Sequence, residues 1–457
     1  MIRQNFNADW TVEKGDGNSR MNSFLGNTQT QTVHLPYDAM IHEARTPDTK
    51  NGAQTGFYPG GEYIFQKHFT APQAWQGKPV SLVFEGVYQT ALVYLNGWLL
   101  TRNVNGYAEF TVEAGPYLKY GADNLLKVIA DNSLEPNSRW YTGSGIYRPV
   151  RLLVGNKVYL PQDTVRITTR EVGEGFALLD VTAQVQSASA VTERVTLQQT
   201  ICREGTAVLT DRQNLLLQPG ESRTVSFRYC VDSPALWSPE NPNLYTSTMQ
   251  VLEGEEELDR EETSFGIRTL SIDAAHGVRI NGQTVKLRGA CIHHDNGILG
   301  AATLPDAEER RIRQLKEAGF NAIRSSHHPA GRALLDACDR YGVLVMDELS
   351  DVWNVRKNPY DYALYFEQDW KPTIQKMVAK DYNHPSVILY CVGNEISEAG
   401  SESGAETNRR LCNTFRELDP TRYTTNALNG LMAAGYRLRE IMGDVTVSYT
   451  HLTLPTK

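Results

Sequence analysis

Apolar and polar residues alternate along the first 270 residues of the chain. The clearest examples are Leu179–Val185, Val225–Val231 and Tyr245–Val251. A period of two residues is typical of β-strands that have one face in a core and the other in water. The dipeptide Asn96-Gly97, between two apolar runs, predicts a tight hairpin. Many short strands joined by turns indicate β-sandwiches.

We divide this β-rich part into two sandwiches near Gly155, where the apolar strand Tyr147–Val154 ends. The second sandwich is expected to close within Pro242–Phe265. The dipeptide Asn281-Gly282 then predicts one more hairpin, which leads into the next domain.

From residue 286 onward, short apolar runs alternate with segments of helical period. The first helix is expected to begin at Thr303-Leu-Pro-Asp306, with Thr303 as the N-cap and Pro305 in the first turn. Strands and helices in alternation, with strands that are almost continuously apolar, predict a parallel sheet covered on both faces. The predicted strands are Lys286–Ile292, Asn321–Ser326, Val343–Leu349, Val387–Val392, Tyr423–Leu428 and a weaker Val445–Tyr449.

This alternation fits either a doubly wound sheet or an incomplete (β/α)8 barrel. Neither a GxGxxG motif nor a P-loop follows the first strand, which disfavours a nucleotide-binding sheet. A complete barrel takes about 250 residues, and only about 170 follow residue 285, so a barrel here would be incomplete. Residues 448–457 show neither pattern, and we interpret them as foreign to the barrel.

The composition is that of a globular protein, with 40% hydrophobic and 21% charged residues, and 457 residues suffice for roughly three domains. The net charge of −8 disfavours a nucleic-acid partner. No apolar run approaches the ~20 residues of a membrane helix, and the first residues lack the apolar core of a secretory signal. The six cysteines have no CxxC spacing, which argues against a zinc site or a disulfide framework. We therefore expect a cytoplasmic protein.

Ionisable residues recur where four successive predicted strands of this part end. They are His293–Asp295, Arg324–His328, Asp347–Glu348 and Asn394–Glu395. In parallel α/β barrels the working groups lie at the carboxyl ends of the strands. One polar strand end would mean little, because loops are polar, but four in succession favour a functional site.

Glu395 is the strongest catalytic candidate among these residues. It ends the apolar run Val387–Val392 and the following Gly393-Asn394, and a carboxylate beside apolar walls has a raised pKa. A raised pKa suits a general acid at neutral pH. The alternative is a carboxylate that stabilises a helix N-terminus. Asn394 is expected either to bind a substrate hydroxyl or to cap the turn.

The histidines at two strand ends make a metal hydrolase the main competing interpretation. Adjacent residues of a strand point to opposite faces, so only one histidine of each pair can face the site, and no HxH spacing is present. One histidine per strand together with Asp347 would still suffice for a metal. We interpret Glu348, Asp351 and Glu398 as loop carboxylates or as support for the site.

Aromatic residues gather in Arg139-Trp140-Tyr141 and in Gly143-Ser-Gly-Ile-Tyr147-Arg148. Flat rings next to polar side chains suit the faces and hydroxyl groups of sugars. The alternative is a packed corner of the first sandwich, which we favour for Tyr147.

Three segments carry a resemblance to a known family. They are Asn321-Ala-Ile-Arg-Ser-Ser-His-His-Pro329, Asp339-Arg-Tyr-Gly-Val-Leu-Val-Met-Asp-Glu348 and Asn383-His-Pro-Ser-Val-Ile-Leu-Tyr-Cys-Val-Gly-Asn-Glu395. In these segments the chain resembles glycoside hydrolase family 2, which includes β-galactosidases, β-glucuronidases and β-mannosidases. The motifs are specific for the family and much less specific for the sugar.

The resemblance covers essentially the whole chain and implies a multidomain fold of β and α/β class. We expect a jelly-roll sugar-binding β-sandwich in residues 1–155 and an immunoglobulin-like β-sandwich in residues 156–270. Residues 271–457 would form the N-terminal part of a (β/α)8 TIM barrel, truncated on its C-terminal side.

The resemblance also implies roles for single residues. Glu395 would be the acid/base of a retaining mechanism, and Asn394 would bind the sugar 2-hydroxyl. Arg324 would lie beside the nucleophile, and His293 and His327 would line the pocket for the terminal sugar. The complete set of predicted substrate-binding residues is Asn394, Arg324, His293, His327, Asp347 and Trp353.

Retention of configuration needs a second carboxylate about 5–5.5 Å from the first. The family places that glutamate on a later strand, which this chain does not reach. The chain by itself is therefore expected to lack the nucleophile and the covalent step.

The chain departs from the family pattern at several positions. A tryptophan is common at the position of Tyr390, and a serine or glycine at the position of Cys391. Members with a magnesium site carry Glu-x-His after the third strand, where this chain has Leu349-Ser-Asp-Val-Trp-Asn354. We therefore infer no required metal and no cofactor. Many relatives have an aspartate at the position of Arg139, so this chain should recognise sugar hydroxyls differently at that rim.

The segments Ser138–Arg148 and Lys357–Tyr362 most resemble β-galactosidases of the family. The resemblance thus implies an exo-acting β-galactosidase that takes β-linked oligosaccharides or glycosides. A β-glucuronidase or related β-uronidase is the alternative within the family, and a non-catalytic carbohydrate-binding protein is the alternative outside it. No nucleic acid or membrane partner is expected, and a homo-oligomer of the full-length form is left open.

Overall fold

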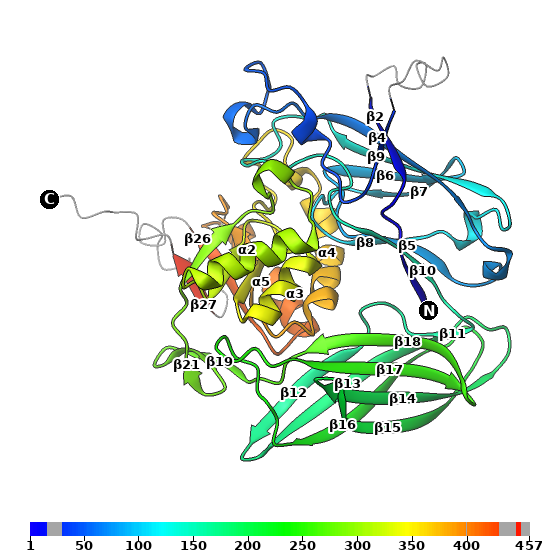
Figure 1. The fold of residues 1–457 in the computed structure, drawn as a ribbon. Helices are drawn as coiled ribbons and strands as arrows, with labels where there is room; N and C mark the ends of the chain where they lie inside the picture. Colours follow the sequence, from blue (N-terminus) through cyan, green and yellow to red (C-terminus); the bar gives the residue numbers. More distant parts are fainter. Residues whose placement is uncertain (16–29, 399, 429–444, 449–457) are drawn as a thin grey trace.

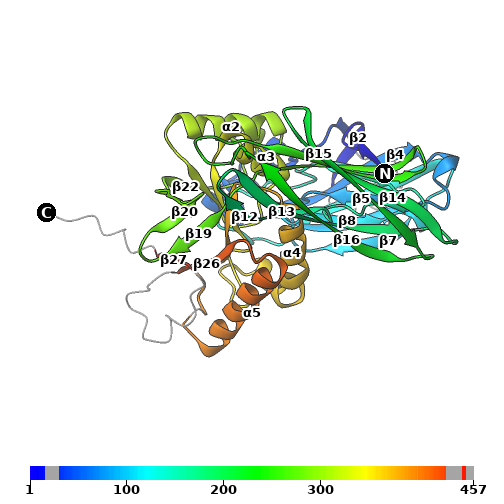
Figure 2. The same cartoon turned by 90° about the horizontal axis from the view of Figure 1, so that it is seen from below.

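The computed structural model describes residues 1–15, 30–398, 400–428 and 445–448 (Figure 1). In chain order, these residues form two β-sandwiches and an α/β domain. Figures 1 and 2 show the α/β domain beside both sandwiches. In the described part of the chain, no helix is long and apolar enough to cross a membrane.

The first sandwich consists of two antiparallel sheets with the strand orders β1-β10-β5-β8 and β3-β2-β4-β9-β6-β7. Its core includes the fully buried rings of Trp10, Phe65 and Phe84. The strands are β1 (Ile2–Asn5), β2 (Trp10–Gly15), β3 (Gln31–Val33), β4 (Gly61–Thr70), β5 (Val80–Phe84), β6 (Thr90–Leu95), β7 (Trp98–Asn103), β8 (Phe110–Glu113), β9 (Asp123–Asn132) and β10 (Val150–Val154).

The predicted hairpin at Asn96-Gly97 is confirmed, since it joins β6 to β7. Both residues have positive φ, +52° and +88°, as a type I′ turn requires. An asparagine and a glycine tolerate this left-handed backbone better than other residues, which explains why the dipeptide marks the turn.

The second sandwich packs β13, flanked by β12, β11 and β16, against a sheet of order β15-β14-β17-β18. The alternating residues of Leu179–Val185 and Val225–Val231 lie in its core, as their period predicted. The strands are β11 (Val158–Tyr159), β12 (Arg166–Gly173), β13 (Phe176–Ser187), β14 (Glu193–Arg203), β15 (Thr206–Leu217), β16 (Ser222–Asp232), β17 (Tyr245–Glu253) and β18 (Glu256–Phe265).

A small antiparallel sheet precedes the α/β domain and contains the predicted hairpin at Asn281-Gly282. The domain itself has a parallel sheet of order β22-β23-β24-β25-β26-β27. The strands of both sheets are β19 (Leu270–Asp273), β20 (Gly277–Ile280), β21 (Gln283–Thr284), β22 (Gly289–Ile292), β23 (Ala322–Ser325), β24 (Leu344–Glu348), β25 (Val387–Asn394), β26 (Tyr423–Leu428) and β27 (Val445–Ser448). The α-helices are α2 (Pro305–Glu317), α3 (Arg332–Tyr341), α4 (Phe366–Asp381) and α5 (Glu402–Leu418), and the short 3-10 helices are η1 (Met40–His42), η2 (Gly52–Thr55), η3 (Gln73–Trp75), η4 (Gly115–Tyr117), η5 (Gly297–Leu299) and η6 (Tyr362–Leu364).

In the described part of the chain, the helices α2 to α5 pack on one face of the parallel sheet, which excludes the doubly wound alternative. Helix residues such as Leu335 and Phe415 share one core cluster with Val345 of β24. On the opposite face, Leu344 and Ile388 belong to a separate cluster that contains no α-helical residue. A parallel sheet with its α-helices on one face is the arrangement of an incomplete (β/α)8 barrel, so the predicted fold class is confirmed.

The N-cap of the first helix of the α/β domain lies one residue later than predicted. Leu304, and not Thr303, is the N-cap of α2, and no side chain caps the helix. The Thr303 hydroxyl instead donates to the carbonyl of Ala301. At the other end of the domain, residues 449–457 lie outside the described residues, so the interpretation of the tail is not tested.

One half-buried arginine joins all three domains. Arg332 of α3 donates to both carboxylate oxygens of Glu109 in the first sandwich, at 2.8 and 3.0 Å, and to Asp163 in the second. Without Arg332, the half-buried Asp163 would lose its guanidinium partner, and Glu109 would keep Arg151, at 3.3 Å, as its charged partner. Hydrogen bonds to charged groups in such places contribute measurably to stability.

We predict that Arg332→Met costs about 2 kcal/mol and lowers the thermal unfolding midpoint by about 2 °C. Arg340→Met is the matched control, because Arg340 lies on the same helix, is half exposed and pairs only with Glu309 among described residues. Differential scanning calorimetry of both variants tests this. Equal midpoints for the two variants would contradict a role for Arg332 in holding the domains together.

Candidate active site

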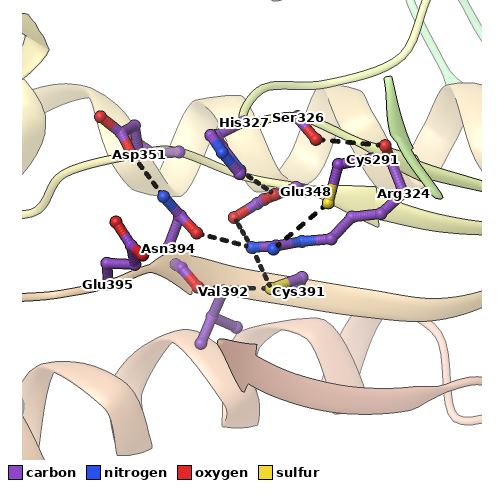
Figure 3. A network of polar contacts seen from close by, with 12 residues as sticks. Cys291, Arg324, Ser326, His327, Glu348, Asp351, Cys391, Val392, Asn394 and Glu395 are labelled. Atoms are coloured by element: carbon purple, nitrogen blue, oxygen red, sulfur yellow. Dashed lines mark hydrogen bonds and ion pairs between the residues drawn. The ribbon is translucent and has the colours of Figure 1, made fainter. Parts of the chain in front are cut away.

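The carboxyl ends of β22, β23, β24 and β25 bring the predicted site residues to one edge of the parallel sheet (Figure 3). In Figure 3, Glu348, Asn394 and two cysteines contact the guanidinium of Arg324. His327 lies against Glu348, Asp351 is joined to the Asn394 amide, and Glu395 lies beside Asn394. Because neighbouring strands are parallel and in register, their ends meet at this edge, as barrel topology requires.

An ion pair between Arg324 and Glu348 lies at the base of the site. Arg324 Nη2 donates to Glu348 Oε1 at 2.6 Å, and the two side chains are only 7% and 0% exposed. The second carboxylate oxygen of Glu348 lies 2.9 Å from Nδ1 of His327. Arg324 Nη2 also donates to Asn394 Oδ1 at 3.1 Å. Charged hydrogen bonds in such a dry place are strong and fix the positions of all four side chains.

Two thiols flank the Arg324 guanidinium. Cys291 Sγ lies 3.9 Å from Nη1, and Cys391 Sγ lies 3.8 Å from Nη2. Burial, followed by the nearby Glu348 carboxylate, raises the pKa of Cys391 to about 12. Cys391 therefore remains a neutral thiol at neutral pH and is a poor nucleophile.

Asp351 connects the strand ends to the first sandwich. Its carboxylate accepts two hydrogen bonds from Arg139, Nε to Oδ2 at 3.0 Å and Nη2 to Oδ1 at 2.7 Å. Lys357 Nζ donates to Oδ1 at 2.9 Å, and Asn394 Nδ2 donates to the same atom at 2.8 Å. Burial alone would raise the pKa of Asp351, but the hydrogen bonds from Arg139 and the charge of Lys357 outweigh it and lower the pKa to about 2.

These contacts fix the orientation of the Asn394 amide. Its oxygen faces the donors of Arg324, and its nitrogen faces the acceptor Asp351. A flipped amide would set donor against donor on one side and acceptor against acceptor on the other. Asn394 is thus held in one orientation before any ligand arrives.

Glu395 follows β25 with a left-handed backbone, φ +46°. Such a conformation costs a non-glycine residue about 1–2 kcal/mol and is concentrated at functional sites. Its carboxylate is 30% exposed and lies 3.5 Å from Arg139 Nη1. The prediction that apolar residues surround the Glu395 carboxylate is therefore wrong, because the guanidinium of Arg139, from the first sandwich, lies beside it. The alternative role at a helix N-terminus is also excluded, since α5 begins only at Glu402.

The first sandwich also places an aromatic ring at the site. Trp140 stacks on His293, with ring centroids 5.0 Å apart and planes at 27°, and meets His327 edge-on at 5.6 Å. Its indole nitrogen donates to the Tyr107 hydroxyl at 3.1 Å. Tyr147, in contrast, is fully buried and donates to the carbonyl of Gly106, so the packed-corner interpretation holds for it.

The histidine pairs divide as strand geometry predicted. His293 and His327 face the site, whereas His294 and His328 are buried behind it. His294 Nε2 lies 2.9 Å from the carbonyl of Thr142, and burial lowers its pKa to about 3. In the described residues, the one group of three side chains arranged as metal ligands is Asp336, Asp339 and His384, which contains none of the strand-end histidines. The metal site composed of one histidine per strand with Asp347 is therefore not assembled.

Two predicted substrate-binding residues are not part of the site. Asp347 is completely buried, where it accepts from the backbone N–H of Ala330 at 2.8 Å and lies 3.7 Å from Lys380 Nζ. Trp353 is also completely buried and donates from its indole to the carbonyl of Val392. Neither side chain can reach a ligand, so both predictions are wrong.

The carboxylates that join the cluster after the third strand are Glu348 and Asp351, which the sequence suggested only as loop or supporting groups. Asp347 and Glu348 are adjacent and point to opposite faces of β24, and composition alone does not say which one faces the site. A cavity of about 50 Å³ lies next to these residues, between the first sandwich and the barrel. Its lining includes Trp140, His327, Asp351, Tyr107 and Asn137.

Three family models match this chain in succession. The model described as glycosyl hydrolase 2 galactose-binding domain-like matches residues 10–162, and that of glycosyl hydrolases family 2 matches residues 158–268. The TIM barrel domain of glycosyl hydrolases family 2 matches residues 274–451.

Curated proteins and solved structures agree with these models. The chain is 37% identical over 406 residues to the β-galactosidase BoGH2A of Bacteroides ovatus, which covers 89% of this chain and 48% of that protein. It is 27% identical to a β-glucuronidase of Bacteroides fragilis, covering 88% of this chain and 58% of that protein. A solved family 2 member from Bacteroides cellulosilyticus superposes with a TM-score of 0.93 at 35% identity, over 98% of this chain and 58% of its own. The chain spans about half the length of the curated relatives it matches.

We predict that Asp351→Asn destabilises the chain by about 2 kcal/mol near pH 6, because the pKa of Asp351 is lowered when the chain folds. A carboxylate with a lowered pKa stabilises the fold above its unfolded pKa, and this contribution is lost as pH falls. The difference from wild type should therefore narrow progressively below about pH 4.

Thermal unfolding followed by circular dichroism across this pH series measures the effect. Asp211→Asn, an exposed aspartate on β15, is the control. A difference for Asp351→Asn that is absent at pH 6, or that stays constant on acidification, would contradict the ion-pair cluster.

Proposed function

We propose that this chain, which belongs to glycosyl hydrolase family 2, is part of an exo-acting, retaining β-glycosidase that removes terminal non-reducing β-D-galactosyl residues. The observation that carries this proposal is the pair Asn394–Glu395 at the end of β25. Asn394 is held in one orientation, and the Glu395 carboxylate next to it is open to solvent. A fixed hydrogen-bonding group beside an accessible carboxylate suits binding of a sugar and proton transfer to its glycosidic oxygen.

Glu395 is the proposed acid/base. It would protonate the leaving-group oxygen in the first step and deprotonate water in the second. The double displacement also needs a nucleophilic carboxylate about 5–5.5 Å away, which we assign to a later strand of the complete barrel, as the family resemblance implies. Asn394 would bind the 2-hydroxyl, and Arg324 would lie beside the nucleophile.

The pocket for the terminal sugar is proposed to include His293, His327 and Trp140. The half-buried indole of Trp140 and the two imidazoles present rings and ring nitrogens, a combination that suits the apolar face and hydroxyl groups of a pyranose. The first sandwich thus contributes directly to the proposed substrate pocket.

Among the residues that the structure describes, the charge balance at the strand ends supports a galactoside over a glucuronide. A uronate would need a cation whose charge is not already neutralised. Arg139 is committed to Asp351 and Glu395, and Lys357 Nζ donates to Asp351 and to the carbonyl of Asn394. The relative with 37% identity bears the name β-galactosidase, in agreement with this preference.

The β-glucuronidase alternative rests on relatives with that name, such as the 27% identical protein of Bacteroides fragilis. A non-catalytic carbohydrate-binding protein remains the alternative of another class. We also propose a cytoplasmic location, supported by the absence of disulfides among the cysteines of the described residues.

The test is turnover of aryl β-glycosides by the protein encoded by the complete reading frame. We predict hydrolysis of the aryl β-galactoside, a slower reaction with the aryl β-glucuronide, and a loss of about 10²–10⁴-fold in Glu395→Gln. Azide should restore turnover in this variant, because an anionic nucleophile needs no general base, and the product should be the β-glycosyl azide.

Glu406→Gln, at an exposed position of α5, is the matched control and should retain full activity. Turnover that survives Glu395→Gln would exclude Glu395 as acid/base. Preference for the glucuronide would select the uronidase alternative, and sugar-dependent tryptophan quenching without any turnover would select the binding protein.

A further inference from the structure

A second cleft, of about 360 Å³, lies between the second sandwich and the barrel. One wall comes from β12 and the segment that follows β18, and the other from the loops that precede β25 and β26. Figure 1 shows β12 on the side of the second sandwich that faces the α/β domain. The cleft is at the amino ends of β25 and β26, whereas Asn394 and Glu395 are at the carboxyl end of β25, so the two sites are separate.

The lining of this cleft is cationic. It includes Arg170, Arg268 and Arg422, and none of its residues is an aspartate or glutamate. The same lining carries four threonines, Thr168, Thr169, Thr269 and Thr421. A concentration of guanidinium groups and hydroxyls is unexpected in a chain with a net charge of −8.

Arg268 has no carboxylate partner within ion-pair distance in the part of the chain that the structure describes. Its Nε donates to the carbonyl of Pro385 at 2.6 Å, and its Nη2 donates to that of Val387 at 2.8 Å. Burial, and then the neighbouring Arg422, lower the pKa of Arg268 to about 9. The cation is therefore held in a place that disfavours its charge.

Asp419 and Asp339 are the carboxylates whose charges raise the pKa of Arg268, and both are hydrogen-bonded to other groups. Asp419 accepts from Arg422 and from Thr421. Asp339 accepts from the backbone N–H of Ser386 at 3.0 Å and lies 2.6 Å from Nδ1 of His384. Neither neutralises Arg268 directly, although both reduce the cost of its charge.

The remaining two arginines line different walls of the cleft. Arg422 is fully buried, and it binds Asp419 and the carbonyls of Tyr382 and His384, so it fixes the wall of the barrel. Arg170 on β12 is 58% exposed and shares Asp180 with Arg228, at 3.2 and 2.7 Å. One carboxylate for two guanidinium groups leaves positive charge at the sandwich wall.

We propose that this cleft binds a small molecule through a tetrahedral oxyanion, a phosphate or sulfate group, held by Arg268 and Arg170 of the cleft lining. Planar guanidinium groups bind such oxygens with paired hydrogen bonds, and an anion would neutralise Arg268 where no carboxylate does. The volume exceeds that of the bare ion, so the group belongs to a phosphorylated or sulfated small molecule of about monosaccharide size. This site does not depend on the proposed catalytic function.

Isothermal titration calorimetry of the 457-residue chain at constant ionic strength tests the proposal, with inorganic phosphate, sulfate, glucose 6-phosphate and glucose as probes. We expect phosphate and sulfate to bind with a dissociation constant of about 1 mM or below, and glucose 6-phosphate to bind at least about tenfold more tightly. Equal affinity for the free ion and the ester would overturn the assignment to an esterified molecule. No binding of either at about 10 mM would overturn the site itself.

Variants separate the cleft from general charge effects. Arg170→Gln should weaken binding about fivefold and Arg268→Met about tenfold or more, since each removes a charged hydrogen-bonding partner. Arg212→Gln, an exposed arginine of β15 outside the cleft, should bind as wild type does. If Arg268→Met does not fold, Arg170→Gln decides the outcome. Unchanged affinity in Arg170→Gln, or equal weakening in Arg212→Gln, would overturn the proposal.

Discussion

Two opposite charges, Arg324 and Glu348, are buried together at the carboxyl ends of β23 and β24. Charges in such a place are tolerated only when their remaining hydrogen-bonding positions are satisfied. Here His327 occupies the second oxygen of Glu348, and Asn394 accepts the second bond of Arg324 Nη2. The demand for partners thus fixes side chains from three successive strands relative to one another.

The need of these buried groups for hydrogen-bonding partners extends beyond the barrel. The nitrogen of the Asn394 amide must find an acceptor, which is Asp351, and Asp351 in turn is held by Arg139 of the first sandwich. The domain that precedes the barrel by more than a hundred residues therefore completes the strand-end cluster, and its Arg139 reaches the Glu395 carboxylate. This dependence gives a physical reason for keeping the sandwich and barrel in one chain: the proposed acid/base and its neighbours are set by both.

Much of this arrangement follows from the sequence because it depends on local periodicity. Alternation predicted the sandwich strands, the Asn-Gly dipeptides predicted both hairpins, and the apolar runs after residue 285 predicted the parallel strands whose ends carry Arg324, His327 and Asn394. The incorrect predictions concern properties that do not follow from local periodicity. Whether Asp347 or Glu348 faces the site depends on which face of β24 each side chain takes. Trp353 is buried and donates its indole N–H to the carbonyl of Val392. The link from Arg139 to Asp351 joins residues 212 positions apart, which no local pattern encodes.

The most direct test of the account is a crystal structure of the protein encoded by the complete reading frame, bound to a non-hydrolysable galactoside. The account predicts that the sugar lies at the carboxyl end of β25, with its glycosidic atom within about 3 Å of the Glu395 carboxylate and a hydroxyl bonded to Asn394. A galactoside bound elsewhere on the first sandwich, with the strand-end cluster unoccupied at saturating ligand, would contradict it and indicate a carbohydrate-binding protein instead.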